Sequence, residues 1–285
     1  MKLEGKVAIV TGAGRVGRPG RNRGFGPEIC KQLAMQGADI VVNDFSGPFP
    51  ALPDYDLATK DEVAAVVEEV KGLGRRAISV DADVGNAKAV DEMVKKTLDE
   101  FGRIDILVNN AGVAVGLGPM HELDESLFDL SWYVMAKGPW LCSKAVAKVM
   151  IKQGWGGKIV TIASILGKTY SALAGGYTAA KHAVMGITRT MAAELIGYKI
   201  NVNAICPGWC DTHLLHLKGG AIEMYPKLLG ITEEQLMVAL NGWTPAGRLG
   251  TVEEIAGATV LLCLSPESDY INGQGVAVDG GGITI

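Results

Sequence analysis

The chain has 285 residues, of which 48% are hydrophobic and 20% are charged, so it can bury a large core and is too apolar to be disordered. Its net charge of −4 provides no overall positive field to attract nucleic acid or anionic lipid. No apolar run approaches the roughly 18 residues of a membrane span, and residues 1–6 lack a signal-peptide core, so we expect a cytoplasmic protein without nucleic-acid or membrane partners.

Short β-branched runs alternate with helix-like segments along the whole chain. Near-continuous apolar runs of this length are typical of strands in a parallel sheet that is buried on both faces. The predicted strands span residues 7–10, 39–42, 77–80, 104–108, 158–161, 200–203 and 275–278. The segments between them have apolar residues at helical spacing, as in 62–70. The pattern predicts one α/β domain over residues 1–285, a doubly wound parallel sheet of about seven strands with helices on both faces.

The first loop contains two glycine clusters. Residues 12–17 match GxGxxG after a strand, but Arg18-Pro19-Gly20 is a poor helix start. Residues 24–26 precede Pro27, and proline suits the first turn of a helix. We therefore expect the helix, with its anion-binding N-terminus, to begin at the second cluster.

Two longer segments interrupt the alternation. Residues 45–58 contain three prolines and follow the second strand. Residues 208–243 are rich in leucine and are predicted to form a helical lid. Ligands of open α/β sheets bind outside the carboxyl ends of the strands, so a lid there would cover a substrate.

The sequence resembles the short-chain dehydrogenase/reductase family, whose cofactor loop reads Thr-Gly-x3-Gly-x-Gly. Residues 11–14 and 23–26 supply the two halves of this motif if residues 15–22 are an eight-residue insertion. A lone glycine motif is weak and often only a turn, but further matches follow in order from Lys6 to Gly281. The resemblance implies a Rossmann-type fold and a nicotinamide dinucleotide.

The resemblance also implies a set of cofactor contacts. Asp44 ends the second strand, where an acid can bind the adenosine ribose and repel a 2′-phosphate, which favours NAD. Arg23 stands where a base often assists NADP binding in the family, so NADP is less favoured but not excluded. The expected cofactor contacts are Gly12, Gly14, Arg23, Gly24, Phe25, Gly26, Asp44, Asp83, Val84, Asn110, Ala111, Gly112, Tyr177, Lys181, Pro207, Gly208 and Thr212.

A candidate catalytic set lies in the second half of the chain. Tyr177 and Lys181 are one helical turn apart on one face, which alone would describe an exposed helix pair. Ser164, thirteen residues before Tyr177, completes the spacing of the family's Ser-Tyr-Lys set. By this resemblance Tyr177 is the base, Lys181 lowers its pKa and holds the nicotinamide ribose, and Ser164 stabilises the substrate oxygen.

Some positions depart from the family pattern. Met135 aligns where most members have an asparagine that kinks a helix and seats a relay water, and a thioether cannot donate a hydrogen bond. Either other groups rebuild the relay or catalysis is impaired. Enoyl reductases of the superfamily also lengthen the glycine loop, but they pair a tyrosine with a lysine seven positions on, where this chain has Ala174 and Lys181.

The remaining reactive side chains form no clear site. The arginines at positions 15, 18, 21 and 23 suit either a solvated loop or a phosphate contact. The five scattered cysteines, Cys206 and Cys210 among them, indicate buried thiols rather than disulfides, and neither cysteines nor histidines have metal-binding spacing. The candidate substrate contacts are Ser164, Leu166, Trp209 and His213.

The sequence therefore predicts an NAD-dependent oxidoreductase that interconverts a secondary alcohol and a ketone. Residues 42–47 resemble a segment of 3-hydroxyacyl-CoA dehydrogenases, and residues 54–60 resemble the insertion of carveol-type members with tightly held NAD. With the apolar lid, they favour a bulky lipophilic alcohol or a 3-hydroxyacyl-CoA-like substrate. The alternative is a non-catalytic subunit that pairs with an active paralogue. The family implies a homotetramer or dimer through the long helices at 132–149 and 177–196 and the C-terminal strand.

Overall fold

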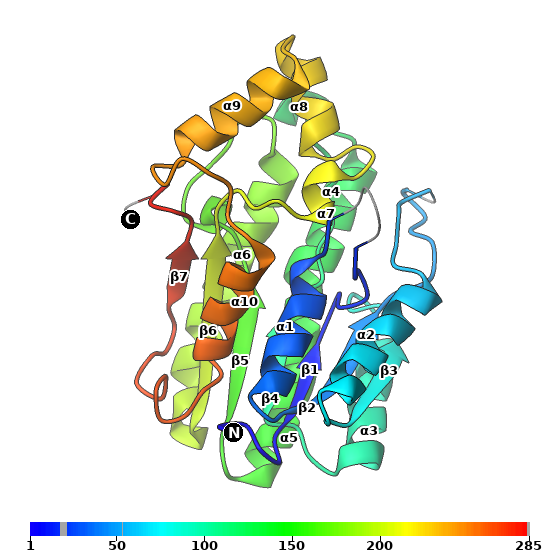
Figure 1. Ribbon diagram of the computed structural model, residues 1–285, viewed down its shortest axis with the longest axis vertical. Coiled ribbons are helices and arrows are strands. Elements are labelled where there is room, and N and C mark those ends of the chain that lie inside the picture. The colour runs from blue at the N-terminus through cyan, green and yellow to red at the C-terminus, as the bar shows by residue number, and fades with distance from the viewer. Residues whose placement is uncertain (18–21, 53, 284–285) are drawn as a thin grey trace.

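The computed structural model describes residues 1–17, 22–52 and 54–283. Seven strands form one parallel sheet in the order β3-β2-β1-β4-β5-β6-β7, which confirms the predicted fold (Figure 1). The strands are β1 (Val7–Val10), β2 (Asp39–Asp44), β3 (Ala77–Asp81), β4 (Ile106–Asn109), β5 (Gly157–Ile162), β6 (Ile200–Pro207) and β7 (Gly275–Val278). The sequence prediction ended β6 at Asn203, whereas pairing with β7 from Ala204 to Pro207 extends the strand.

Helices cover both faces of the sheet. The helices are α1 (Phe25–Met35), α2 (Lys60–Gly72), α3 (Ala87–Phe101), α4 (Glu125–Trp132), α5 (Gly138–Gln153), α6 (Gly175–Leu195), α7 (His213–His216), α8 (Ala221–Leu229), α9 (Glu233–Trp243) and α10 (Val252–Leu261). A π-helical segment, Tyr133–Lys137, joins α4 to α5, and short 3₁₀ turns span Met120–Glu122, Ile165–Gly167 and Ile196–Tyr198. None of the helices in the described residues is long and apolar enough to cross a membrane.

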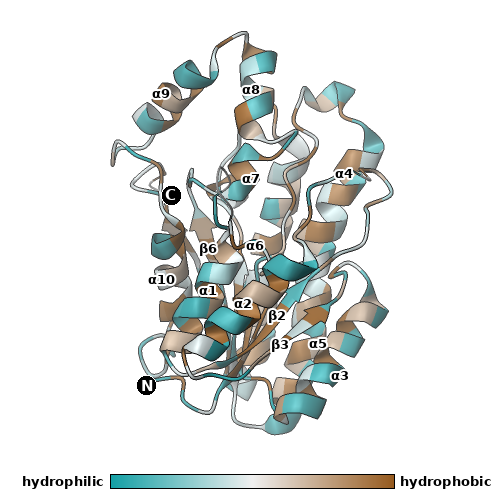
Figure 2. Ribbon diagram, turned by 45° about the vertical axis from the view of Figure 1, so that its right-hand side comes forward, coloured by the Kyte–Doolittle hydropathy of each residue, from teal (hydrophilic) through white to brown (hydrophobic). Residues whose placement is uncertain are grey.

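Successive side chains of a strand point to opposite faces of the sheet, so the core has two layers. Ala8 and Val10 pack with α1, α2 and α10, whereas Ile9 between them packs with α3, α5 and α6. Hydrophobic residues accordingly occupy the strands and the helix sides that face them (Figure 2). The order reverses between β1 and β4, and this switch point is where an open α/β sheet binds its ligand.

The helix after β1 begins at the second glycine cluster, as predicted. Gly24 is the N-cap of α1, and Pro27 lies in its first turn. Ile29 and Leu33 are fully buried one helical turn apart, so this face anchors the helix against the sheet. The N-terminus of α1 therefore lies near the carboxyl end of β1.

Two segments cover the carboxyl end of the sheet. Helices α7 to α9 lie above the strand ends, where the sequence predicts a helical lid, and share an apolar cluster around Ile222, Leu236 and Leu240 (Figure 1). The 45–58 segment packs through Phe49, whose ring lies 5.5 Å from that of Phe45. Both segments stand beside the position where the topology places a ligand.

Candidate active site

The three predicted catalytic side chains meet at the carboxyl end of β5. Ser164 lies two residues after the end of this strand, and Tyr177 and Lys181 lie in the first two turns of α6. The Lys181 ammonium donates a 2.9 Å hydrogen bond to the Ile162 carbonyl and lies 5.3 Å from the centre of the Tyr177 ring. The Leu166 N–H donates to Ser164 Oγ at 3.1 Å, which leaves the serine proton for another acceptor.

Burial sets the protonation of this group. It raises the pKa of Tyr177 to about 12, while a hydrogen bond with Ser164 acts in the opposite direction. Burial also lowers the pKa of Lys181 to about 8. In the protein alone the phenol is therefore protonated at neutral pH, and positive charge brought close to it favours the phenolate.

The glycine loop forms a cradle that requires the absence of side chains. A Cβ atom on Gly26 would lie 2.4 Å from the Gly12 carbonyl oxygen and 2.8 Å from Asn110 Nδ2. Gly12 itself has φ +61°, a conformation that suits glycine. Asn110 Nδ2 donates to the carbonyls of Thr11 and Gly12, so the end of β4 fixes the loop. A glycine turn beside a helix N-terminus fits the pyrophosphate of a dinucleotide.

Asp44 lies where the adenosine ribose of a dinucleotide is expected. Its carboxylate accepts from the Gly14 N–H at 2.6 Å and the Phe45 N–H at 2.8 Å. Burial raises the pKa of Asp44, and these backbone hydrogen bonds act in the opposite direction. The carboxylate also contributes to the wall of the main cavity.

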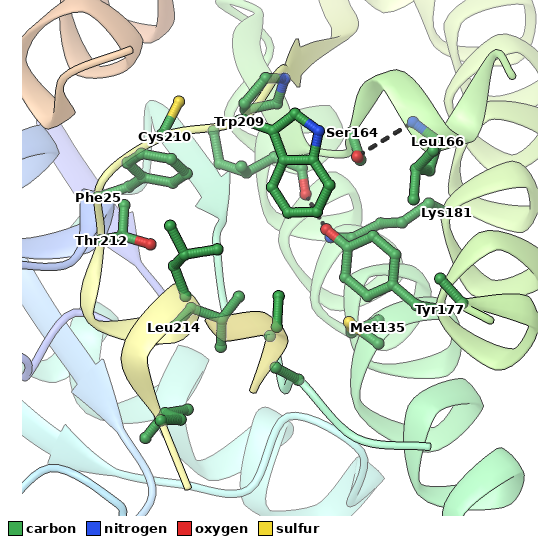
Figure 3. A pocket seen from close by; sticks show the side chains of 18 of the residues that line it. Phe25, Met135, Ser164, Leu166, Tyr177, Lys181, Trp209, Cys210, Thr212 and Leu214 are labelled. Carbon is green, nitrogen blue, oxygen red and sulfur yellow. Dashed lines mark hydrogen bonds between the residues drawn. The ribbon is translucent and has the colours of Figure 1, made fainter. Parts of the chain in front are cut away.

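A cavity of about 740 Å³ joins the glycine loop, the catalytic set and the predicted lid (Figure 3). The predicted cofactor residues on its wall are Gly12, Gly24, Phe25, Asp44, Asn110, Gly112, Tyr177, Lys181, Pro207, Gly208 and Thr212. All four candidate substrate residues, Ser164, Leu166, Trp209 and His213, line it too. Figure 3 shows Phe25 and Thr212 on one side and Ser164, Tyr177 and Lys181 on the other.

Other predicted cofactor residues do not line this cavity. Gly14 and Ala111 belong to the loops after β1 and β4, and Gly26 lies in the first turn of α1. Asp83 accepts from the Tyr133 hydroxyl at 2.9 Å, and Val84 is buried in the core. Asp83 therefore joins the end of β3 to the π-helical segment.

The described arginines of the glycine loop are bound to carboxylates. The Arg23 guanidinium lies 2.7 Å from Glu69 and 3.3 Å from Glu28, away from the cavity wall. Arg15 is buried on the wall, 3.2 Å from Glu62. Arg18 and Arg21 lie outside the described residues. These ion pairs compete with a phosphate for Arg15 and Arg23.

Met135 lies within the π-helical segment. Met135 is buried and lines the cavity. Its sulfur lies close to Gly112, because a Cβ atom added to that glycine would be 3.8 Å from the sulfur. A π-helical turn widens a helix and is frequent at functional sites. The helix is therefore irregular at the position that aligns with the family's asparagine. This chain has the thioether of Met135 there instead of the asparagine amide.

Two tyrosines that sequence reasoning did not assign to the site also line the cavity. Tyr55, in the 45–58 segment, accepts from the Ala114 N–H at 3.1 Å. Tyr225, on α8 in the predicted lid, packs against Trp209. Tyr55 lies in the 54–60 segment that resembles the carveol-type insertion, and Tyr225 lies in the predicted lid, so the sequence indicated the two segments but not which of their side chains face the cavity. Within the described ranges, no cluster of three His, Cys, Asp or Glu residues is arranged to hold a metal.

Comparison with known proteins agrees with this geometry. A family profile described as enoyl-(acyl carrier protein) reductase matches residues 20–282. The 2-dehydro-3-deoxy-D-gluconate 5-dehydrogenase of Dickeya dadantii is 36% identical over 279 residues, which cover 98% of this chain and 96% of that protein. The chain belongs to the short-chain dehydrogenase/reductase family.

Two solved structures that resemble this short-chain dehydrogenase/reductase contain NAD. Carveol dehydrogenase from Mycobacterium avium, in complex with NAD, is 29% identical with a TM-score of 0.88, over 99% of this chain and 98% of that one. NAD⁺-bound xylitol dehydrogenase is 27% identical with a TM-score of 0.86, over 99% and 100% of the two chains. The protein is an oxidoreductase of this family, as the sequence predicts.

Proposed function

We propose that this protein is an NAD-dependent dehydrogenase that interconverts a bulky lipophilic secondary alcohol and its ketone. The observation that carries the proposal is the shared cavity, whose wall contains Ser164, Tyr177 and Lys181 together with the glycine loop and Asp44. A base, a hydrogen-bond donor and a dinucleotide cradle around one space are the groups that this oxidation needs.

The catalytic residues have separate roles in this proposal. Bound NAD supplies the hydride acceptor. Tyr177 takes the hydroxyl proton of the alcohol at its phenolate oxygen, and the Ser164 hydroxyl donates a hydrogen bond to the same substrate oxygen. The Lys181 ammonium, 5.3 Å from the Tyr177 ring centre, favours the phenolate by its charge.

Two contacts support NAD over NADP. Asp44 presents a buried carboxylate at the wall, which would repel a 2′-phosphate. Arg23, the base that would assist NADP, pairs instead with Glu69 and Glu28. The solved carveol and xylitol dehydrogenases contain NAD, which supports the same choice.

The cavity lining supports an uncharged, lipophilic substrate. Among the described lining residues, the carboxylate, guanidinium, ammonium and imidazole groups are those of Arg15, Asp44, Asp56, His213 and Lys181. The side chains from the lid are largely apolar, including Leu214, Leu215, Leu217, Leu240 and Trp243. No described lysine or arginine of the lid lines the wall, so the lid offers no permanent cation for the phosphates of a coenzyme A thioester. We therefore place the lipophilic alcohol ahead of the 3-hydroxyacyl-CoA alternative.

A combined binding and turnover experiment tests the proposal. We expect mass spectrometry or calorimetric titration to show bound NAD, with much weaker NADP binding. Lipophilic secondary alcohols should then reduce NAD, and Tyr177→Phe should lower kcat at least ~100-fold while NAD still binds. Turnover of polyols alone would contradict the substrate class. Retained cofactor binding without any turnover would favour the non-catalytic subunit, and absence of NAD binding would contradict the dehydrogenase.

The assembly and location remain predictions. The homotetramer or dimer, or pairing with a paralogous subunit, would use helices that include Trp132 and Trp140, both partly exposed in this chain. Light scattering of the purified protein measures the assembly, and cell fractionation tests the cytoplasmic location.

A further inference from the structure

We propose that Tyr225 is a specificity-determining residue, which holds the Trp209 indole as a fixed wall beside the reaction centre and so limits the size of the alcohol. This inference rests on the proposed dehydrogenase function. It assigns to α8 a role in substrate choice that the catalytic set does not explain.

Trp209 projects from the strand end next to the catalytic residues. It follows Pro207-Gly208 at the end of β6, and its side chain points into the cavity with those of Tyr177 and Ser164 (Figure 3). Its backbone carbonyl accepts from the Gly250 N–H at 2.9 Å, which fixes the main chain. The direction of the indole within the cavity therefore depends on what packs against the ring.

Tyr225 is the aromatic neighbour that packs against this indole. The two ring centres are 6.2 Å apart and the rings are inclined by 77°, an edge-to-face arrangement that aromatic pairs favour. Tyr225 is 8% exposed and belongs to the apolar cluster shared by α8 and α9. The orientation of the Trp209 wall is thus tied to the packing of the lid.

The Tyr225 hydroxyl also connects the lid to the catalytic segment. Its oxygen lies 3.4 Å from Ser171 Oγ, and Ser171 stands between Ser164 and Tyr177 in the chain. Burial raises the pKa of Tyr225, so its phenol stays protonated near neutral pH and remains a hydrogen-bond donor. The lid ring, the indole and the catalytic segment therefore form one connected wall.

The connection predicts different effects for the ring and the hydroxyl. Removing the ring frees the indole to move away from the reaction centre, which enlarges the space beside the carbinol carbon. Removing only the hydroxyl leaves the edge-to-face contact but releases the wall from Ser171. The ring should therefore control the preference between small and bulky alcohols, and the hydroxyl should mainly affect KM.

The experiment compares Tyr225→Leu, Tyr225→Phe and the control Leu229→Ala, which changes an exposed residue on the same helix. Secondary alcohols of increasing size, from 2-butanol through cyclohexanol to 2-substituted cyclohexanols, are oxidised with NAD. We expect Tyr225→Leu to change the kcat/KM ratio of bulky to small alcohols at least tenfold in favour of bulky ones. Tyr225→Phe should change that ratio less than threefold but raise KM at least threefold with kcat nearly unchanged. Leu229→Ala should alter neither.

A second readout does not depend on turnover. The fluorescence of Trp209, obtained as the difference between the parent and a Trp209→Phe variant in each background, should shift with Tyr225→Leu and not with Leu229→Ala. An unchanged alcohol preference together with unchanged Trp209 fluorescence would overturn the inference. If the wild-type protein oxidises no alcohol, the proposed function fails, and the fluorescence still decides whether Tyr225 positions Trp209. If Tyr225→Leu does not fold, Tyr225→Met, which also removes the ring, takes its place in both readouts.

Discussion

The ammonium of Lys181 donates a 2.9 Å hydrogen bond to the backbone carbonyl of Ile162. This contact joins α6, which carries Tyr177, to the strand whose end carries Ser164. The lysine therefore has a fixed position beside the Tyr177 phenol. Burial lowers the pKa of Lys181 to about 8. Its charge acts on the phenol from a defined place, which a surface lysine would not have.

Replacing Lys181 by methionine should slow alcohol oxidation and change its pH dependence. Oxidation needs the Tyr177 phenolate, whose fraction rises with pH because the pKa of the buried phenol is about 12 without cofactor. Removal of the ammonium takes away a charge that favours the phenolate, so the pH of half-maximal kcat/KM should rise. We expect kcat/KM at pH 7 to fall ~100-fold or more.

Steady-state rates from pH 6 to 10.5 measure this change, with the exposed Lys152→Met as control. A Lys181→Met variant with lower activity but an unchanged pH profile would contradict a charge effect and leave the lysine a binding role alone.

Alanine substitutions at two nearby glycines should weaken NAD binding to very different extents. A Cβ atom on Gly26 would lie 2.4 Å from the Gly12 carbonyl, which would distort the cradle, whereas the nearest atom to a Cβ on Gly24 is 3.6 Å away. We expect Gly26→Ala to weaken NAD binding at least ~30-fold and Gly24→Ala less than ~threefold. Calorimetric titration checks both, and equal losses would argue against the cradle at Gly26.

Removing the charge of Asp44 should reduce discrimination against NADP. In the unchanged protein the Gly14 N–H lies 2.6 Å from the Asp44 carboxylate. Asp44→Asn keeps an oxygen that can accept this hydrogen bond but lacks the charge that repels a 2′-phosphate. The ratio of the NAD and NADP dissociation constants should move at least ~tenfold toward NADP. Asp81→Asn, a neighbouring acid that does not line the cavity, is the control. An unchanged ratio in Asp44→Asn would show that another group sets the preference.

Local pattern was sufficient to predict the elements that lie within one stretch of chain. The apolar runs predicted all seven strands. The five inner strands are buried on both faces and must be apolar along their length, whereas the edge strands β3 and β7 are partly exposed. The beginning of α1 after the second glycine cluster followed from Gly24 and Pro27 alone. The spacing of Tyr177 and Lys181 likewise places both side chains on one helix face, whatever surrounds the helix.

Contacts between distant parts of the chain were decided only by the tertiary structure. Arg15 meets Glu62 from α2, and Arg23 meets Glu69, so two arginines that suited a phosphate are bound to carboxylates. Tyr225 reaches Trp209 because the lid folds back over the end of β6. The sequence determined which residues prefer strand, helix or turn, since those preferences depend on near neighbours. Which side chains meet depends on how the sheet and the lid pack, and that packing brings together residues that no local pattern relates.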